Sequence, residues 1–523
     1  MNRLHEFTRA ALLGLDRAPL PDFDNDPGPD SELRQLLTQV SCAAPAAALL
    51  TAAGVLGVYE RAGATPVLHI RLPDAAPSLD QTKRPCPASA AYHLGAMLNG
   101  RNTPLLDELL TALAAGNYAA PSVLLPALLE RGAKQSRQRV AIIKLLDDDQ
   151  RALAAENPTW RYAGPATDSY SGLRALWRTT SETRELQGLL IQSREMEPAW
   201  GRRLLAGSWK SLADNQRSAL IALPADGLGP DDEPFLEAAL DDRSQTVRRK
   251  AAELLAHLPD SALARRMATR MDDIIRRTHE GEHAVVPRFP EEFSPELIRD
   301  GVLPRSGKNV AHLRGMQLME MVGATPLDHW SEAWRMPPDE VVKTMRDSLW
   351  PRTLTQALCT AAVRQQREDW AMALLEATDI HEHALGVVPA LSPAACDDLL
   401  RRRPQRFPVD EPLTRKSLLV LFLRQQKEMW SPLFIRRFWE QLGYQADGKS
   451  VDDEEKKDFL VDSLIKQSAR NCPPELLDEG IVLLRNLPAS DSRARTLGET
   501  ISVMEFRRAM LADIEITSPR AQN

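Results

Sequence analysis

Two histidines near the middle of the chain have the spacing of a zinc-protease motif. Residues 279–283 read HEGEH, which matches the pattern His-Glu-x-x-His. In enzymes with this motif the two histidines lie one helical turn apart and bind zinc, and the glutamate beside them acts as the general base. This chemistry would make the protein a zinc-dependent hydrolase acting through His279 and His283, with Glu280 as the base.

The surroundings of the motif favour a charged surface segment over a metal site. Gly281 weakens a helix inside the motif, and Pro287 and Pro290 end any helix soon after it. A second short pattern, HEH at 381–383, has no partners at ligand spacing. The chain also lacks the GxxxxGK[ST], GxGxxG and GxSxG patterns of phosphate loops and nucleophile elbows. We therefore expect no catalytic residues, no cofactor and no bound metal, and we expect that the protein is not an enzyme.

The second candidate chemistry is the contact of arginines with phosphates. Residues 243–277 hold a dense basic cluster, which Asp272 and Asp273 interrupt. Arginines along one face suit nucleic acid, whereas arginines spread around several helix faces are ordinary solvated positions. The whole chain carries 65 Lys and Arg against 72 Asp and Glu, a net charge of −7, which speaks against nucleic acid as the main partner. A nucleic-acid-binding helical repeat using the basic residues around 243–277 stays the alternative function.

The elements that carry these residues are amphipathic helices. Apolar residues between 247 and 258 recur at offsets of 4, 7, 8 and 11, which form one stripe of an α-helix. Residues 241–244 supply turn and N-cap chemistry before this helix, and Pro259 ends it. Because a pair of such helices leaves an apolar face uncovered, stacking on neighbouring pairs is expected. The spacing predicts an all-α protein, an α-solenoid of HEAT- or armadillo-like antiparallel helix pairs. Val247 and Leu254 should be buried in it, and Arg249 exposed.

The segment at 240–259, LDDRSQTVRRKAAELLAHLP, resembles a HEAT repeat. In such repeats the acid of the turn and the arginine after the valine meet their counterparts in adjacent repeats and form a ladder. The resemblance therefore implies structural roles for Asp241, Asp242, Val247 and Arg248.

Several marks along the chain resemble an uncharacterised bacterial family of HEAT-like helical-repeat proteins. They are AALLGLDR (10–17), CPASAAYHLGAMLNG (86–100), LAAENPTWRY (153–162), LDDRSQTVRRKAAELLAHLPDSALARRM (240–267) and FSPELIRDGV (293–302). The segment before Asn157 lacks the Gly-rich, Trp-bearing lead expected there. The resemblance implies no established activity. It implies a gene neighbourhood with MoxR-type AAA+ ATPases and von Willebrand factor A-domain proteins, which ranks these proteins first as partners.

Segments rich in proline, glycine and charge suggest where the chain divides. We expect an N-terminal helical region (1–85), a central HEAT-like array (86–284), a connector (285–309) and a C-terminal helical array (310–523). The one strand candidate is PVLHIRLP at 66–73. Five scattered cysteines without a CxxC pair, no signal-peptide core and no apolar run near 18 residues predict a soluble, cytoplasmic protein without a membrane segment.

The function expected from these features is that of a non-catalytic scaffold or adaptor that presents a helical-repeat surface to protein partners. Stacked repeats expose an extended surface for binding. Since tryptophan and arginine are the commonest anchors of protein interfaces, the candidate partner-binding residues are Arg266, Arg270, Trp334, Trp430 and Trp439. The alternative role for each tryptophan is a plug between repeat layers.

Overall fold

The structure is a computed structural model of the chain. Contacts divide it into two compact units, residues 1–79 and residues 80–523. The described residues are 9–13, 15, 31–40, 44–63, 83–223, 227–278, 283–288, 294–302, 310–377, 384–411, 413–426, 429–446, 459–487 and 491–517.

The first unit contains two helices that pack against each other, α2 (Ser31–Val40) and α3 (Pro45–Gly63). Their buried core is small and consists of Leu33, Leu37, Ala52 and Leu56. The strand candidate at 66–73 lies outside the described residues.

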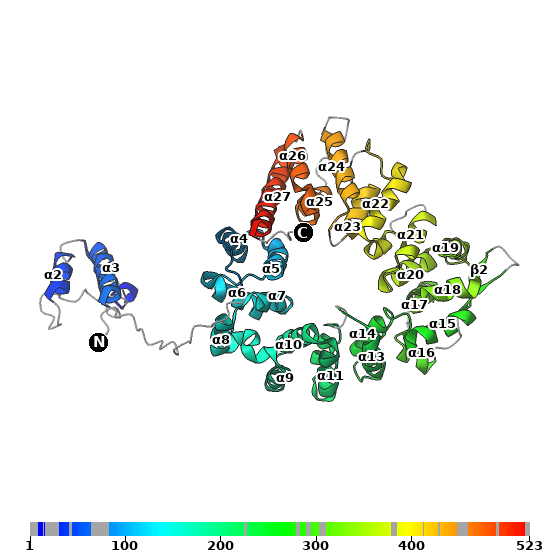
Figure 1. The fold of residues 1–523 in the computed structure, drawn as a ribbon, viewed down its shortest axis with the longest axis horizontal. Coiled ribbons are helices and arrows are strands. Elements are labelled where there is room, and N and C mark those ends of the chain that lie inside the picture. Colours follow the sequence, from blue (N-terminus) through cyan, green and yellow to red (C-terminus); the bar gives the residue numbers. More distant parts are fainter. Residues whose placement is uncertain are drawn as a thin grey trace, which may run out of the picture. The chain divides into compact units, whose positions relative to one another are not determined.

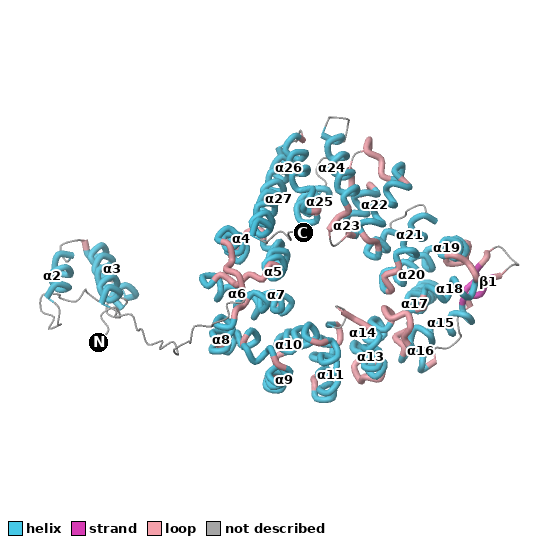
Figure 2. The backbone as a smooth tube through the Cα atoms, viewed as in Figure 1, coloured by secondary structure: helices cyan, strands magenta, loops and turns pink. Residues whose placement is uncertain are grey.

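The second unit is predominantly helical, in agreement with the class that the sequence predicts (Figure 2). Its helices are α4 (Ala88–Leu98), α5 (Leu106–Ala115), α6 (Leu125–Lys134), α7 (Arg139–Leu145), α8 (Asp148–Glu156), α9 (Tyr170–Thr179), α10 (Thr183–Met196), α11 (Pro198–Ser208), α12 (Asp214–Leu220), α13 (Glu233–Ala239), α14 (Gln245–Leu255), α15 (Ala262–Ile274), α16 (Pro295–Arg299), α17 (Val310–Ala324), α18 (Leu327–Trp334), α19 (Pro338–Arg346), α20 (Pro351–Arg364), α21 (Glu368–Ala377), α22 (Pro393–Arg402), α23 (Leu418–Gln425), α24 (Pro432–Ala446), α25 (Phe459–Asn471), α26 (Leu477–Asn486) and α27 (Asp491–Thr517).

The strands of the described residues form one short hairpin that the sequence analysis did not predict. Strand β1 (Ile275–Arg277) pairs antiparallel with β2 (Val285–Pro287), and Ile275 lies opposite Pro287. Each strand has three residues, which is too short for a period-2 pattern to be recognised. The first strand follows α15 directly.

The helix at the centre of the repeat-like segment begins where its residues predict but ends at Leu255, before the predicted end at Pro259. Helix α14 starts at Gln245, after a turn in which the Asp242 carboxylate accepts a hydrogen bond from the Ser244 backbone N–H. Val247 and Leu254 are buried and Arg249 is exposed, so the predicted helix face is confirmed. Helix α15 follows after Ser261, whose hydroxyl caps it by accepting a hydrogen bond from the Ala264 N–H.

Contacts between helices of the second unit form a closed circuit. Each of the following elements contacts the next, and the last contacts the first: α5, α7, α10, α12, α14, α15, α17, α20, the 3₁₀ helix Ala384–Ala390, α23, α25 and α27. Figure 1 shows α27 lying beside α4 and α5. One core cluster runs from Ile221 to Met504 and includes Val285, Leu297 and Val302 of the segment expected to be a connector.

Helix α27 closes the circuit through a second core and a buried ion pair. Its residues Phe506, Met510 and Ile514 share a hydrophobic cluster with α4 to α7. Arg507 is 1% exposed and donates to both carboxylate oxygens of Glu108 on α5, at 2.8 Å from Nε to Oε2 and 2.7 Å from Nη2 to Oε1. The same guanidinium donates to two carbonyl oxygens at the end of α25, those of Ala469 in its last turn and of Cys472 just after it. One side chain thus joins elements separated by 399 residues in the sequence.

We predict that Arg507→Met destabilises the second unit strongly. The variant keeps an apolar stem but leaves the Glu108 carboxylate and two carbonyl oxygens without their donor. Loss of one partner of a fully buried pair costs about 3–5 kcal/mol, and because Glu108 is 29% exposed we expect a value near the lower limit. The matched control is Arg508→Met, since the neighbouring Arg508 pairs with Asp478 on the surface and such pairs contribute at most about 1 kcal/mol. Thermal unfolding should show a much lower Tm for the first variant only; equal Tm values would contradict the closing role of Arg507.

A second prediction concerns the face of α14. Leu254→Asp should unfold the surrounding helices, because an unpaired carboxylate would replace a side chain in the packed core. Arg249→Asp on the exposed face is the control and should leave the thermal unfolding curve close to that of the wild type. A Leu254→Asp protein with unchanged Tm would show that this face does not carry the core.

Candidate functional site

Two of the predicted partner-binding arginines hold a buried carboxylate instead of facing solvent freely. Arg266 donates to Asp300 at 2.7 Å and also reaches Glu237 at 3.1 Å. Arg270 donates to the other oxygen of Asp300 at 2.6 Å. The Asp300 side chain is 1% exposed and follows α16. The two arginines of α15 therefore fix the end of α16 and, through Glu237, helix α13.

The charge of Asp300 depends on these arginines. Burial by itself would raise the pKa of the Asp300 carboxyl, but the hydrogen bonds from Arg266 and Arg270 outweigh burial, and the net effect lowers the pKa. The carboxylate is therefore ionised at neutral pH and the three charges hold one another in place.

The predicted tryptophans differ in exposure. Trp430 and Trp439 are 0% and 2% exposed, which is the position expected of plugs between layers. Trp334 is half-buried, packs edge-on against Trp330 at 5.6 Å between ring centroids, and has the guanidinium of Arg277 at 5.9 Å from its ring. Of these three tryptophans, only Trp334 has ring surface within reach of a partner.

The residues predicted to form a ladder make contacts between helices, with one difference. The carboxylate of Asp242 accepts from Arg217 on α12 at 2.9 Å and 3.1 Å, and Asp241 accepts from Arg299 on α16 at 2.7 Å. Arg248 instead donates to backbone carbonyl oxygens of its own turn, at Asp242 and Arg243. The turn acids thus link neighbouring elements, while Arg248 stabilises the start of α14.

Further buried arginines make equivalent contacts earlier in the chain. Arg139 on α7 donates to Glu185 on α10 at 3.0 Å, and its side chain is fully buried. Arg194 on α10 donates to Asp232, just before α13, at 2.9 Å. Such pairs are costly to desolvate, so they fix the register of neighbouring helices more than they add stability.

The basic cluster at 243–277 is largely neutralised by its own surroundings. Contacts to carboxylates are made by Arg243 (to Asp214), Lys250 (to Glu253), Arg266 and Arg270 (to Asp300) and Arg276 (to Asp273). Arg265 donates to the carbonyl oxygen of Asp260. Paired cations have less charge to offer to phosphates, which weakens the case for nucleic acid at this cluster.

The histidine motif is only partly within the described residues. His283 has its Nδ1 at 3.7 Å from Asp347 Oδ1, whereas His279 and the 381–383 segment lie outside the described residues. No group of three or more metal-ligating side chains lies together within the described ranges.

The buried cysteines are not activated nucleophiles. Burial raises the pKa of the Cys86 thiol to about 11, and it is the main cause that raises the pKa values of Cys359, Cys396 and Cys472 to about 12. All four thiols are therefore protonated at neutral pH, and the protonated thiol is a poor nucleophile.

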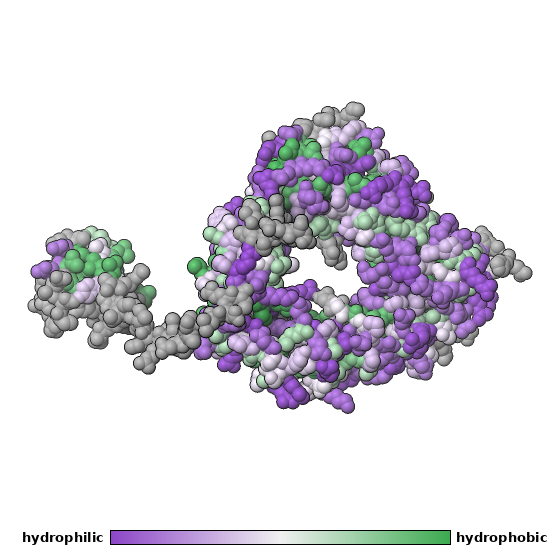
Figure 3. All heavy atoms as spheres, viewed as in Figure 1, coloured by the Kyte–Doolittle hydropathy of each residue, from purple (hydrophilic) through white to green (hydrophobic). Residues whose placement is uncertain are grey.

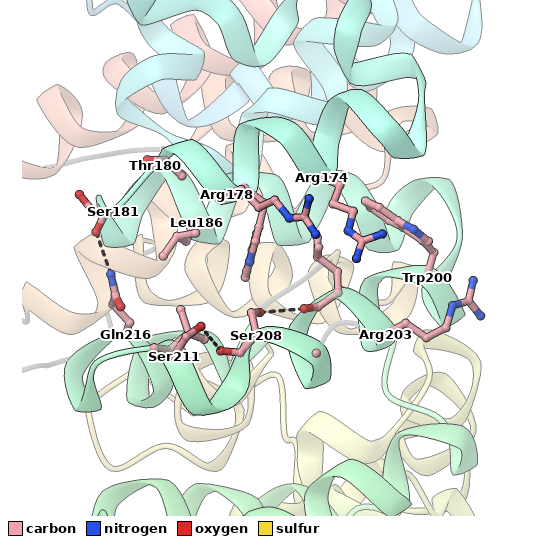
Figure 4. Close-up of a pocket in the computed structure, with 14 residues that line it drawn as sticks. Arg174, Arg178, Thr180, Ser181, Leu186, Trp200, Arg203, Ser208, Ser211 and Gln216 are labelled. Atoms are coloured by element: carbon pink, nitrogen blue, oxygen red, sulfur yellow. Dashed lines mark hydrogen bonds between the residues drawn. The ribbon is translucent and has the colours of Figure 1, made fainter.

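The site that the sequence analysis missed is a groove between α9 and α11. Its volume is about 630 Å³, and α10 contributes Leu186 to its floor (Figure 4). One wall is a stripe of α9, and the other is formed by α11 and the residues that follow it. The lining residues are Arg174, Trp177, Arg178, Thr180 and Ser181 from α9 and its C-terminal end, and Trp200, Arg203, Leu204, Gly207, Ser208, Ser211, Leu212 and Gln216 from α11 to α12.

Contacts between α9 and the residues of α11 and α12 bound the groove at both ends. At one end the ring of Tyr170 lies 5.1 Å from that of Trp200, and the Tyr170 hydroxyl donates to Glu197 at 2.8 Å. At the other end Gln216 donates to the carbonyl oxygen of Ser181 at 2.7 Å (Figure 4). The hydrogen bond to Glu197 raises the pKa of Tyr170, so this hydroxyl stays a donor at neutral pH. The groove has fixed ends and an open side.

The charged residues that line the groove are all basic. Three arginines and no carboxylate line it. Arg203 reaches Glu197 at 3.4 Å on the surface, while Arg174 and Arg178 are exposed and make no ion pair with the described part of the chain. These guanidinium groups keep N–H donors that can bind a ligand, unlike the arginines that hold the helices together.

A sequence match places the chain in a family. Residues 6–514 match a family of unknown function, DUF5691. The chain belongs to this family. The match supports the resemblance to an uncharacterised family over nearly the whole length. No curated protein and no solved structure matches the chain.

The spacing of arginines and tryptophans in the sequence gives a weak indication of the groove. Arg174 and Arg178 are four residues apart with Trp177 between them, and Trp200 precedes Arg203 by three residues, so each set shares one helix face. Only tertiary structure brings the two faces together. Among the described helices, none is long and apolar enough to cross a bilayer.

We predict that Asp300→Asn destabilises the protein in a pH-dependent way. Because the folded-state pKa of Asp300 lies below the unfolded value of about 3.9, its ionisation stabilises the fold above that pH and ceases to do so as pH falls through the folded-state pKa. The Tm difference between wild type and variant should be full at pH 7 and shrink below about pH 4. Asp273→Asn, which changes an exposed pair, is the control. A difference that is constant with pH would contradict this role of Asp300.

Proposed function

We propose that the protein is a non-catalytic scaffold or adaptor, an α-solenoid of HEAT- or armadillo-like helix pairs whose surface binds protein partners. The contacts of helices with their neighbours in chain order support the repeat arrangement, because stacked repeats touch mainly their neighbours. The buried arginine–carboxylate pairs between successive helices support it as well.

The observation that carries the proposal is the groove between α9 and α11. Its three arginines lie together with the ring of Trp200, which packs against the core on one side and is half-buried. Arginine and tryptophan side chains that converge in a cleft are typical of protein-binding sites. On the face drawn in Figure 3, hydrophilic side chains cover much of the second unit, which fits a surface in contact with water until a partner binds.

The first partner to test follows from the family resemblance. We propose a MoxR-type AAA+ ATPase or its von Willebrand factor A-domain companion, in the cytoplasm. An adaptor for an ATPase needs no reaction centre of its own, which agrees with a groove that holds neither a carboxylate nor a histidine.

The experiment is affinity purification of the tagged full chain from its own host under gentle conditions, followed by mass spectrometry. We expect a protein recovered in stable ratio, with the ATPase or its companion as the leading candidate, and we expect recovery to survive nuclease treatment. An identically tagged unrelated protein controls for non-specific capture. A clean monomer without partners would overturn the scaffold function, and partners lost on nuclease treatment would favour the nucleic-acid alternative.

A further inference from the structure

We infer that the groove between α9 and α11 binds an acidic segment of the partner protein, a short stretch in which carboxylates flank an apolar or aromatic side chain. The inference rests on the proposed function and names the chemistry of the partner. Charge complementarity is the first argument, because the lining has three arginines and no acidic residue. Guanidinium groups bind carboxylates through paired, charge-assisted hydrogen bonds.

The placement of the charges and the aromatic rings fits such a segment. Figure 4 shows Arg174 and Arg178 on one wall and Trp200 and Arg203 at one end of the other. The half-buried side chains of Trp200 and Leu204 supply apolar surface beside these cations. A carboxylate of the bound segment can therefore contact an arginine on a wall of the groove, while a neighbouring apolar side chain of the same segment contacts the apolar surface.

The carboxylates of a flanking pocket argue against a polyanion such as nucleic acid. On the far side of α9, a pocket of about 440 Å³ shares Thr180 with the groove and is lined by Arg161, Arg184 and the acids Glu182 and Glu185. A continuous run of phosphates crossing the helices would meet these carboxylates, whereas a peptide can carry basic residues where they lie.

The built ends of the groove also favour a segment of defined length. The Tyr170–Trp200 contact and the Gln216–Ser181 hydrogen bond span the space between its walls. The ligand must therefore enter from the open side and place a few residues between these two crossings.

The test begins with a random peptide library displayed on phage and selected on the purified full chain. We expect the selected peptides to be enriched in Asp and Glu around one aromatic or aliphatic residue. The affinity of synthetic, fluorescein-labelled copies is then measured by fluorescence anisotropy, with a single-stranded oligothymidylate of similar length as the competing probe. Selected peptides without acidic enrichment, or tighter binding of the oligothymidylate through the same arginines, would overturn the inference.

The decisive variant is Arg174→Glu/Arg178→Glu, which should weaken peptide binding by roughly tenfold or more. Its matched control is Arg249→Glu/Arg352→Glu, which makes the same charge change at two exposed arginines outside the groove. Arg174→Gln/Arg178→Gln serves if the charge reversal prevents folding. Trp200→Ala should also weaken binding while leaving the charge unchanged. Equal affinity of the groove and control variants for the peptide would overturn the inference.

The same variants separate this inference from the proposed function. If the wild type captures a partner in the host and Arg174→Glu/Arg178→Glu captures it equally, the scaffold function stands and the groove is not its site. If the wild type captures nothing, the scaffold function itself fails. If Arg174→Glu/Arg178→Glu fails to capture the partner and Arg249→Glu/Arg352→Glu still captures it, the result supports both the scaffold function and the groove as its binding site.

Discussion

Every amphipathic helix of the second unit has an apolar face that another helix must cover, and the helices at the two ends of an array would leave faces open. Helix α27 meets this constraint by inserting Phe506, Met510 and Ile514 into the core of α4 to α7. The first and last helices thus cover each other. The rest of the unit depends on this contact, because the circuit of helix contacts is complete only when α27 lies against α5.

Hydrophobic contact alone does not fix how far one helix slides along another. Buried arginines do so here, since each guanidinium has donors in a fixed planar geometry that must be matched by particular oxygens. Arg507 joins Glu108 to carbonyl oxygens at the end of α25, Arg217 joins Asp242 to α12, and Arg266 joins Asp300 to α13. A buried charge without its partner is unfavourable by several kcal/mol, so alternative registers that separate these groups are excluded.

Two sets of described arginines differ in how far their donors are satisfied within the chain. Those at the junctions of helices have their donors satisfied by carboxylates and carbonyl oxygens of the same chain. Arg174 and Arg178, on the exposed side of α9, have no carboxylate in their groove to neutralise them. The first set of arginines holds helices together, and the second is the set to which we assign partner binding in the proposed function.

The sequence by itself determined the helices, because the pattern of apolar residues at helical spacing is a local property. The pattern correctly predicted the buried face of α14, with Val247 and Leu254 inside. The match to a family of unknown function agrees with the resemblance found in the sequence motifs. The sequence did not reveal the hairpin of β1 and β2, whose three-residue strands are stabilised by a partner and not by a pattern of their own. The sequence also did not predict that Arg266 and Arg270 bind Asp300, because Asp300 lies 34 and 30 residues away from them and its approach depends on the packing of α16.

Only the tertiary structure decided which helix faces meet. The Arg507–Glu108 pair spans 399 residues, and the groove joins a stripe of α9 to a stripe of α11 that no local spacing relates. Residue type alone also left each tryptophan with two possible roles, and burial distinguished Trp430 and Trp439 from the half-exposed Trp334. The physical reason is the same in each case: helix formation follows from neighbours in the sequence, whereas burial, ion pairing and the convergence of side chains follow from neighbours in space.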